Sequence, residues 1–264
     1  VRGNHEDNFY LEGLRLNEIF RNDFSATYTI SDADGMSFAV FDGMGGAAYG
    51  EIASEIAVQT MKKYERRLKN AEGMRAVDQI VTEFVTEANN SICDMLREKN
   101  CLSGGTTFAM LYFIDGLAKL YYLGDSRIYM QDEEDLICLT RDHTLANQKL
   151  DAGIYTEAQA KKSADQHRLT LYVGVDKNGL GLNADSRPPV ALQPGRKFLL
   201  CTDGLVDMCS EQEIQDILSQ DYFNEAAVLV QTAVNYGGID NVTCIVLEVI
   251  PIEEPAELES DPML

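Results

Sequence analysis

Amphipathic segments and short apolar runs occupy different parts of this chain. Over residues 50–69 and 76–99, apolar positions recur at the spacing of one helix face. Compact apolar runs bounded by turn residues, which are typical of strands, occur at 38–41, 106–114, 117–123, 127–130, 136–139, 198–202 and 242–249. The pattern therefore predicts two long helices early in the chain and a strand-rich remainder.

Turn and cap signals between these segments indicate hairpins rather than parallel crossovers. Asp115-Gly116 directly joins two apolar runs, which is a strong hairpin signal, and the acidic turn 132–135 joins two more. A helix is also predicted over residues 224–236. Two capping boxes predict helix starts at residues 157 and 211; they are Thr156 with Gln159 and Ser210 with Glu213. Strands and helices that segregate in this way predict an α+β fold, with antiparallel sheets and helices packed outside.

The domain organisation follows from length and local composition. A chain of 264 residues fits one domain better than two, and we expect a single domain over residues 1–250. Residues 144–190 are polar and contain glycines around a short helix, so we expect a flap or small subdomain there, with an ordinary surface excursion as the alternative. The acidic, proline-containing tail over 251–264 is expected to be disordered.

The net charge and the cysteine pattern argue against several kinds of partner and site. The net charge of −21 argues against a nucleic-acid or anionic-membrane partner, because both need Lys and Arg. No apolar stretch approaches a membrane span and no signal peptide is visible, so a cytoplasmic location is expected. The six cysteines form no CxxC pair, and Cys138, Cys201 and Cys244 lie in apolar runs. We therefore expect reduced core thiols, without a disulfide framework or zinc site.

Four acidic segments fall at strand ends or beside glycine, and together they suggest a metal centre. They are Glu6-Asp7, Asp42-Gly43, Asp203-Gly204 and Asp240-Asn241. Any one of them alone is better explained as a turn. Carboxylates at the mouth of a sheet can instead gather around Mg²⁺ or Mn²⁺, which prefer oxygen ligands.

At these and further positions the chain resembles the type 2C family of metal-dependent Ser/Thr protein phosphatases, bacterial-type members included. The resemblance covers nearly the whole chain, in the family's order and spacing. The matching segments are Arg2-Gly-Asn-His-Glu6-Asp7, Phe41-Asp-Gly-Met-Gly-Gly46 with Gly50-Glu51-Ile-Ala-Ser54, Gly104-Gly-Thr-Thr107, Gly124-Asp-Ser-Arg-Ile-Tyr129, Thr140-Arg-Asp-His143, Cys201-Thr-Asp-Gly-Leu-Val-Asp207 and Gly238-Ile-Asp-Asn-Val-Thr243.

The resemblance implies a fold and a set of metal ligands. The implied fold is an α-β-β-α sandwich, in which two antiparallel sheets lie between outer helix layers. Asp42 would bridge two Mn²⁺ or Mg²⁺ ions, and Asp7 would hydrogen-bond a metal-bound water. The remaining implied ligands are Asp203 and Asp240 on one ion, Glu6 and the Gly43 carbonyl on the other, and Asp125 and Asp207, with Asp203, on a third.

The implied activity is hydrolysis of phosphoserine and phosphothreonine on proteins by a metal-activated water. Two such ions can lower the pKa of a shared water and clamp an in-line displacement, so no enzyme nucleophile is needed. Arg2 matches the family arginine that grips the substrate phosphate with its planar fork. The implied partners are phosphorylated proteins, as substrates of a Ser/Thr kinase, and we expect a monomer.

Two departures from the family pattern concern proton transfer, and they leave other functions open. Ala47 and Ala48 stand where many bacterial relatives have a histidine, and His5 replaces the usual asparagine before Glu6. No general acid is therefore assigned. The main alternative is a catalytically weak or dead relative that binds phosphoproteins. A phosphatase for small phosphoesters and a purely structural metal protein are the other two. His167 is expected to be an ordinary surface residue.

Overall fold

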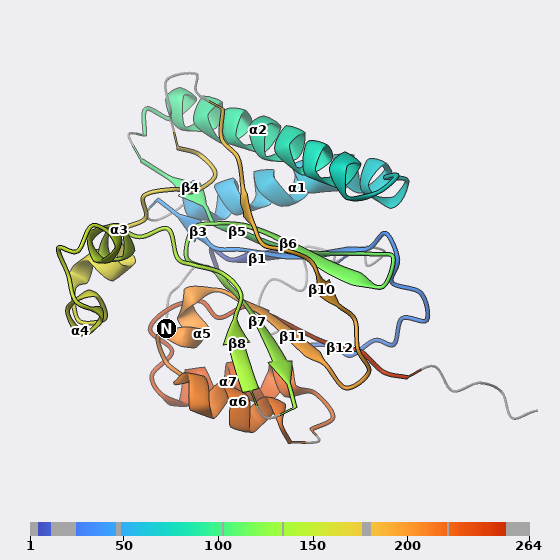
Figure 1. Cartoon of the computed structure of the whole chain (residues 1–264). Coiled ribbons are helices and arrows are strands. Elements are labelled where there is room, and N and C mark those ends of the chain that lie inside the picture. The colour runs from blue at the N-terminus through green and yellow to red at the C-terminus, as the bar shows by residue number, and fades with distance from the viewer. Residues whose placement is uncertain are drawn as a thin grey trace, which may run out of the picture.

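Two antiparallel sheets lie face to face between layers of helices (Figure 1). The structure is a computed structural model that describes residues 5–11, 25–45, 49–101, 103–133, 135–175, 181–220 and 222–251. Helices α1 and α2 cover the outer face of one sheet, and α5, α6 and α7 cover the outer face of the other. The predicted α-β-β-α sandwich is confirmed.

The first sheet has six strands, and its order is β1-β2-β5-β6-β10 with β9 also paired to β6. Its strands are β1 (Asn8–Leu11), β2 (Ser37–Phe41), β5 (Phe108–Ile114), β6 (Leu117–Leu123), β9 (Asp185–Ser186) and β10 (Val190–Ala191). The run expected as one strand from residue 106 is divided, because β4 (Gly105–Thr106) pairs with β3 (Gly43–Met44) as a separate ribbon. The glycine-rich segment after β2 is therefore partly a strand.

The second sheet has the order β12-β11-β7-β8. Its strands are β7 (Arg127–Asp132), β8 (Asp135–Cys138), β11 (Lys197–Cys201) and β12 (Cys244–Glu248). Asp115 and Gly116, between β5 and β6, have φ angles of 52° and 71°. Both central residues of a type I′ hairpin turn have positive φ, so the predicted hairpin is confirmed.

Helix ends follow the predicted caps. Both capping boxes form, at the starts of α4 and α6. Asn224 caps α7 by accepting a hydrogen bond from the backbone of Ala227 at 2.8 Å. The helices are α1 (Tyr49–Lys69), α2 (Met74–Glu98), α3 (Leu145–Asp151), α4 (Glu157–Ala160), the 3₁₀ helix η2 (Ala164–His167), α5 (Asp203–Val206), α6 (Glu211–Leu218) and α7 (Glu225–Asn235).

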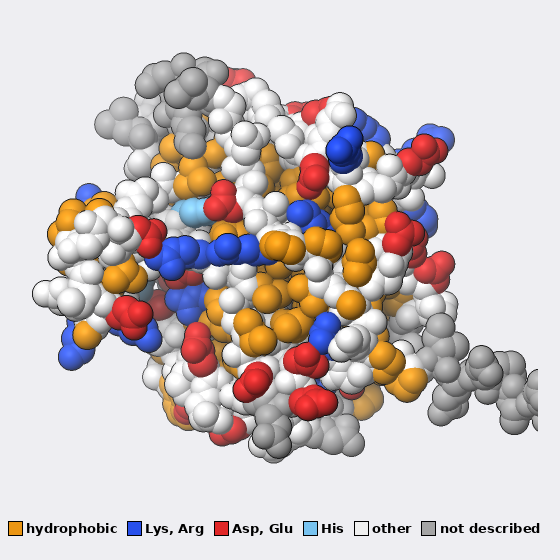
Figure 2. Space-filling view, viewed as in Figure 1, with side chains coloured by type: hydrophobic (Ala, Val, Ile, Leu, Met, Phe, Trp, Pro, Cys, Tyr) orange, Lys and Arg blue, Asp and Glu red, His pale blue; other side chains and the backbone are white. Residues whose placement is uncertain are grey.

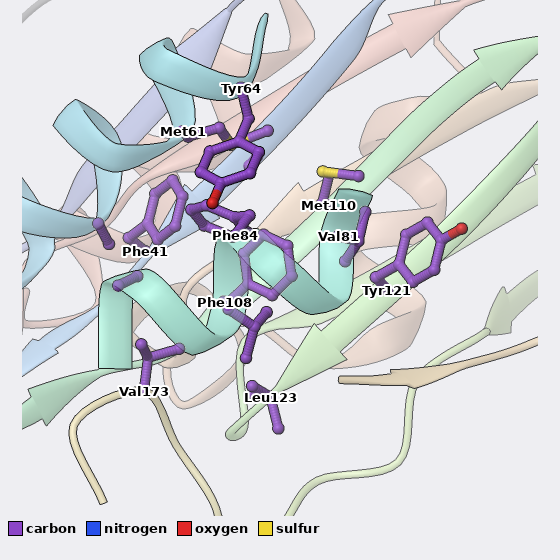
Figure 3. Close-up of a cluster of buried hydrophobic side chains, with 14 of the residues drawn as sticks. Phe41, Met61, Tyr64, Val81, Phe84, Phe108, Met110, Tyr121, Leu123 and Val173 are labelled. Carbon is purple, nitrogen blue, oxygen red and sulfur yellow. The ribbon is translucent and has the colours of Figure 1, made fainter. Parts of the chain in front are cut away.

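Three apolar cores hold these layers together. One lies between α1, α2 and the first sheet, where Phe84 of α2 packs against Phe108 at a ring distance of 5.1 Å, and Phe108 against Phe41 at 5.7 Å (Figure 3). A second fills the space between the two sheets, and a third lies between the second sheet and α5, α6 and α7. Each fully buried large apolar side chain contributes about 1.5–3 kcal/mol to the stability of the fold. The packed sandwich therefore holds the loops at its edge in fixed positions.

All six cysteines are free, as expected, but the sequence pattern wrongly predicts that Cys138 is a core residue. Cys201 is buried, whereas Cys138 is exposed. Cys138 ends the edge strand β8, where a side chain has no sheet neighbour on one side, so an apolar run did not ensure burial. No helix in the described ranges has both the length and the apolar character to cross a membrane.

Helices α3, α4 and η2 form a small lobe at one end of the sandwich (Figure 1), which we call the helical lobe (residues 144–169). A bridge between Thr144 and Leu169 closes its base. Figure 2 shows basic and acidic side chains side by side on this lobe, and Lys149 pairs there with Asp165 at 2.5 Å. The expected flap range of 144–190 thus contains the helical lobe and β9, and it ends at the first residue of β10.

Candidate metal centre

The acidic segments meet where strands of the two sheets begin and end. Glu6 and Asp7 precede β1, Asp42 follows β2, and Asp203 follows β11. The backbone N–H of Glu6 donates to Asn241 Oδ1 at 2.9 Å, and Thr202 Oγ1 donates to Asp7 Oδ2 at 2.8 Å. These two bonds tie the start of β1 to segments about 200 residues later in the chain.

Two glycines allow the backbone to close tightly around Glu6. A Cβ on Gly43 would lie 2.2 Å from the Gly50 carbonyl oxygen and 2.5 Å from that of Glu6. A Cβ on Gly50 would lie 2.7 Å both from Glu6 Oε2 and from the Gly43 carbonyl oxygen. These last two oxygens, which are the expected ligands of one ion, therefore face the same small space beside Gly50.

Asp42 is fixed by its backbone. Its N–H donates to Thr107 Oγ1 at 2.8 Å, and the Thr107 N–H donates back to the Asp42 carbonyl at 2.8 Å. Thr107 Oγ1 also lies 2.6 Å from Ser126 Oγ, which links Asp42 to the loop that carries Asp125. Thr107 lies between β4 and β5, and it is this residue that bonds to both Asp42 and Ser126.

The same loop is held from its other side. Arg127 forms a forked ion pair with Asp142, with nitrogen–oxygen distances of 2.8 to 3.2 Å. His143 Nδ1 accepts a hydrogen bond from the Gly124 N–H at 3.1 Å. Residues of the Thr140–His143 segment therefore position the loop.

The carboxylates of this centre are buried or partly buried close to one another, and this raises the pKa of two of them. Burial, opposed by hydrogen bonds from Thr202 and Thr243, raises the pKa of Asp7 from 3.8 to about 7, and the charges of Asp203 and Asp240 add to the rise. Burial also raises the pKa of Asp42 well above its usual value, with contributions from the charges of Asp7 and Asp203 and a hydrogen bond with the Asp203 carboxyl. Anions in this centre thus lack sufficient compensating positive charge.

A bound divalent cation fits this arrangement. Asp203 Oδ1 is buried and has no hydrogen-bond partner in the described part of the chain, although buried polar atoms are usually satisfied. The neighbouring donors are carboxylate and carbonyl oxygens, the ligands that Mg²⁺ and Mn²⁺ prefer. A dication would relieve both the unpaired oxygen and the mutual repulsion of the carboxylates.

Asp240 lies near Asp203 because the residues that follow them, Asn241 and Gly204, are in very close backbone contact. A Cβ on Gly204 would be 1.9 Å from the carbonyl oxygen of Asn241, so α5 can approach this loop only with glycine there. Asp240 Oδ1 accepts a hydrogen bond from the Asn241 N–H at 2.7 Å. Its charge also contributes to the raised pKa of Asp7 and of Asp207, so the segment belongs to the same electrostatic cluster.

The third expected ligand set is brought together only in part. Burial and the charge of Asp203 raise the pKa of Asp125, which places this carboxyl near the cluster. Within the described ranges, however, only one group of three His, Cys, Asp or Glu side chains brings its ligand atoms within 4.8 Å of one another. It consists of His167, Asp203 and Asp207. No sequence motif includes His167, which is expected only as an isolated surface histidine.

Several expected residues fall outside the structure's coverage or serve other contacts. Arg2, Ala47 and Ala48 lie outside the described residues. His5 Nδ1 lies 3.2 Å from the backbone carbonyl of Asp7, which makes this nitrogen the protonated donor. His5 therefore turns one ring nitrogen toward its own backbone.

Comparison with known proteins shows which family this chain matches. A sequence model described as "Protein phosphatase 2C" matches residues 15–234. Protein phosphatase PhpP of Streptococcus pneumoniae is 32% identical over 220 residues, which cover 82% of this chain and 86% of PhpP. Serine/threonine phosphatase stp of Listeria monocytogenes is 29% identical over 79% of this chain and 82% of its own length.

Solved structures agree with the sequence comparison. The Mycobacterium tuberculosis serine/threonine phosphatase PstP/Ppp superposes with a TM-score of 0.75 at 25% identity, over 95% of this chain and 94% of that chain. The catalytic domain of PstP in complex with two manganese ions gives a TM-score of 0.70 at 26% identity, with the same coverage. The match of the family over most of the sequence, together with the shared sandwich, shows that this chain belongs to the protein phosphatase 2C family.

Proposed function

We propose that this chain hydrolyses phosphoserine and phosphothreonine on proteins at the acidic cluster between the two sheets. The observation that carries the proposal is the gathering of the buried Asp7 with the partly buried Asp42 and Asp203, with raised pKa values at Asp7 and Asp42 and a buried, unpartnered oxygen on Asp203. Such a cluster is unfavourable unless cations occupy it. Family membership and the manganese-bound PstP structure support Mn²⁺ or Mg²⁺ as those cations.

The chain's own residues would bind and position the ions. Asp42, held at both its N–H and its carbonyl, would bridge two of them. Glu6 and the Gly43 carbonyl would ligate one ion, and Asp203 with Asp240 the other. When bound, such ions supply an activated water nucleophile and neutralise charge on the phosphoryl group.

Asp7 would accept a proton or orient water. Thr202 Oγ1 holds one of its oxygens at 2.8 Å, and burial brings its pKa to about 7 in the absence of a cation. A bound dication would lower that pKa, because an opposite charge favours the carboxylate. Asp7 would then be an acceptor fixed in orientation beside the reacting phosphate.

Substrate recognition is the part that depends on Arg2, which would offer its guanidinium fork to two phosphoryl oxygens. The substrates that follow from the family are phosphoproteins, modified by a Ser/Thr kinase, and relatives carry the name serine/threonine phosphatase. We further propose a monomer, a cytoplasmic location, and one domain over residues 1–250 with a flap and a terminal tail.

A phosphopeptide assay tests the proposed function against the binding-only alternative. Phosphate release from a phosphothreonine peptide should require Mn²⁺ and stop with a chelator. Asp94→Asn, a change in an exposed surface pair, is the matched control and should keep the wild-type rate, whereas Asp203→Asn should lose it. Tight peptide binding without release at saturating Mn²⁺ would instead favour a catalytically dead, phosphoprotein-binding relative.

A further inference from the structure

The second sheet ends at β8, and the outer side of this strand is open. Among the described strands, β8 pairs with β7 alone. The Leu139 N–H donates to the Ile128 carbonyl at 2.8 Å, so residue 139 turns its backbone groups toward β7. Because this direction alternates along an antiparallel strand, Ile137 does the same, whereas the N–H and C=O of Leu136 and Cys138 point outward. No residue in the described ranges forms a hydrogen bond with these outward groups.

The edge of β8 also lacks the features that usually protect a free strand. Natural sheets protect their edges with short strands, prolines, lysines or bulges. The edge strand of the first sheet, β10, is protected in this way, since it has two residues and follows Pro188 and Pro189. In contrast, β8 has four residues, Asp-Leu-Ile-Cys, with neither lysine nor proline. Its backbone is therefore available to a strand from another chain.

The side chains beside this edge are apolar and reach the surface. Ile137 is 44% exposed, although Met130, opposite it on β7, is only 8% exposed. Leu139, Val190 and Leu192 pack against the core between the two sheets and are only partly buried. Figure 2 shows hydrophobic side chains gathered on the face where β7, β8 and β10 lie in Figure 1. We call Ile137, Leu139, Val190 and Leu192 the edge strip.

Arg196 connects the two sheets at one end of the edge strip. Its side chain is buried, and it donates to the Ala191 carbonyl at 2.6 Å and to Asp132 Oδ2 at 2.6 Å. These bonds join the end of β10 to the turn between β7 and β8. The edge strip is therefore a preformed surface, which lowers the ordering cost of binding.

The turn that begins β8 carries uncompensated negative charge. Its sequence is Asp-Glu-Glu-Asp, and the first of these residues, Asp132, is already in an ion pair. Glu133 and Asp135 are exposed, and neither forms an ion pair within the part of the chain that the structure describes. Beyond the other end of β8, Arg141 is paired with Asp151. The charge that remains free beside the edge strip is thus negative.

These features together indicate what binds there. An extended segment would pair with the outward backbone groups of β8, and apolar side chains at its alternate positions would cover the edge strip. Basic side chains opposite the acidic turn would complement its charge. A second copy of this chain fits less well, because each copy has a net charge of −21, and a large net charge keeps proteins monomeric.

We infer that the edge of β8 and the edge strip bind an extended segment of another protein, which has apolar residues at alternate positions and Lys or Arg beside Glu133 and Asp135. The segment would add a strand to the second sheet, with hydrogen bonds to Leu136 and Cys138. This inference does not depend on the proposed function, because β8 carries none of the residues of the acidic cluster.

Selection from a phage-displayed library of random short peptides against the wild-type protein tests the inference and supplies the probe. The enriched peptides should show alternating apolar residues and at least one Lys or Arg. One enriched peptide, synthesised with a fluorescent label, then gives a Kd by anisotropy. Higher salt should weaken its binding, because exposed charges are screened.

A pair of variants at Cys138 separates the backbone edge from the side chain. Cys138→Pro removes the outward N–H without touching the bonds to β7, and proline is tolerated where its nitrogen faces solvent. It should weaken the selected peptide by at least about tenfold, because one hydrogen bond is lost and the ring blocks the edge. Cys138→Ser, the matched control, should stay within about twofold of the wild type, since it keeps the N–H. Asp135→Lys should also weaken binding, and it tests the charge if Cys138→Pro does not fold.

Three results would overturn the inference. The first is selection that yields no enriched peptide. The second is a peptide that binds Asp135→Lys and folded Cys138→Pro as tightly as the wild type. The third is a wild-type protein that sediments as a dimer and becomes a monomer in Cys138→Pro, because a second copy would then occupy the edge.

Discussion

Removing the charge of Asp7 should make the metal-free protein more stable. Asp7 is 8% exposed, and burial with neighbouring charges raises its pKa from 3.8 to about 7. A raised carboxyl pKa means that the folded state binds the proton more tightly than the unfolded state. The free energy of unfolding therefore falls as pH rises from about 4 to about 7, and the full penalty remains above pH 7.

The size of this penalty follows from the shift. About 3 pKa units at roughly 1.4 kcal/mol each give up to about 4 kcal/mol at pH 8. Asp7→Asn keeps an oxygen for Thr202 Oγ1 and is neutral at every pH. In a chelator at pH 8, the variant should thus be more stable than the wild type by as much as about 4 kcal/mol, and the difference should shrink toward zero near pH 4.5.

Urea denaturation followed by circular dichroism, at both pH values, measures the effect. Asp94→Asn is the control, because Asp94 is 70% exposed in a surface pair with Arg97, and its change should stay within about 1 kcal/mol at either pH. With saturating Mn²⁺ the advantage of Asp7→Asn should diminish, since the ions compensate the wild-type charge. Equal or lower stability of Asp7→Asn in chelator at pH 8 would refute the electrostatic reasoning.

Three further predictions concern metal, backbone and leaving group. Mn²⁺ at a hundredfold excess over its Kd should stabilise the wild type by about 2.7 kcal/mol in the same urea assay, and an unchanged midpoint would argue against the cluster. Gly43→Ala should destabilise the fold by about 3 kcal/mol or more, because its Cβ would meet the Gly50 carbonyl at 2.2 Å, whereas Gly181→Ala, with no atom within 4 Å, should be nearly neutral; similar midpoints for the two would contradict the tight packing. Because Ala47 replaces a family histidine, and a general acid contributes about 10²- to 10⁴-fold, kcat should depend steeply on leaving-group pKa across aryl and alkyl phosphates. Ala47→His should flatten that dependence, and a shallow wild-type slope that the variant leaves unchanged would show that the proton donor is already present.

Much of the fold was predictable because local signals agreed with the global architecture. The Asp115-Gly116 turn, the capping box at Ser210 and the helical period of α2 each specify their element from neighbouring residues alone. The exception at β8 has a physical cause. Apolar character does not distinguish a central strand from an edge strand, so Cys138 was expected in the core although it lies at the surface.

The candidate centre was predictable in its residues but not in its geometry. The motifs named Asp42 and Asp203, yet the closeness of their carboxyls depends on how two sheets stack, which no local pattern encodes. His167 lies at the surface, as expected, but its place beside the cluster was not predictable, for the same reason. Its position beside Asp207 is set by the path of the helical lobe, whose base is closed by pairing between residues 144 and 169.

The most direct test of the acidic cluster as the catalytic metal centre is phosphate release by Asp42→Asn from a phosphothreonine peptide at saturating Mn²⁺. Charge stabilisation by bound ions contributes several kcal/mol to the transition state, so kcat should fall by at least about 1,000-fold. The variant should remain folded, with a urea midpoint in chelator at or above that of the wild type, because a buried unpaired charge has been removed. Turnover near the wild-type rate by folded Asp42→Asn would contradict the account.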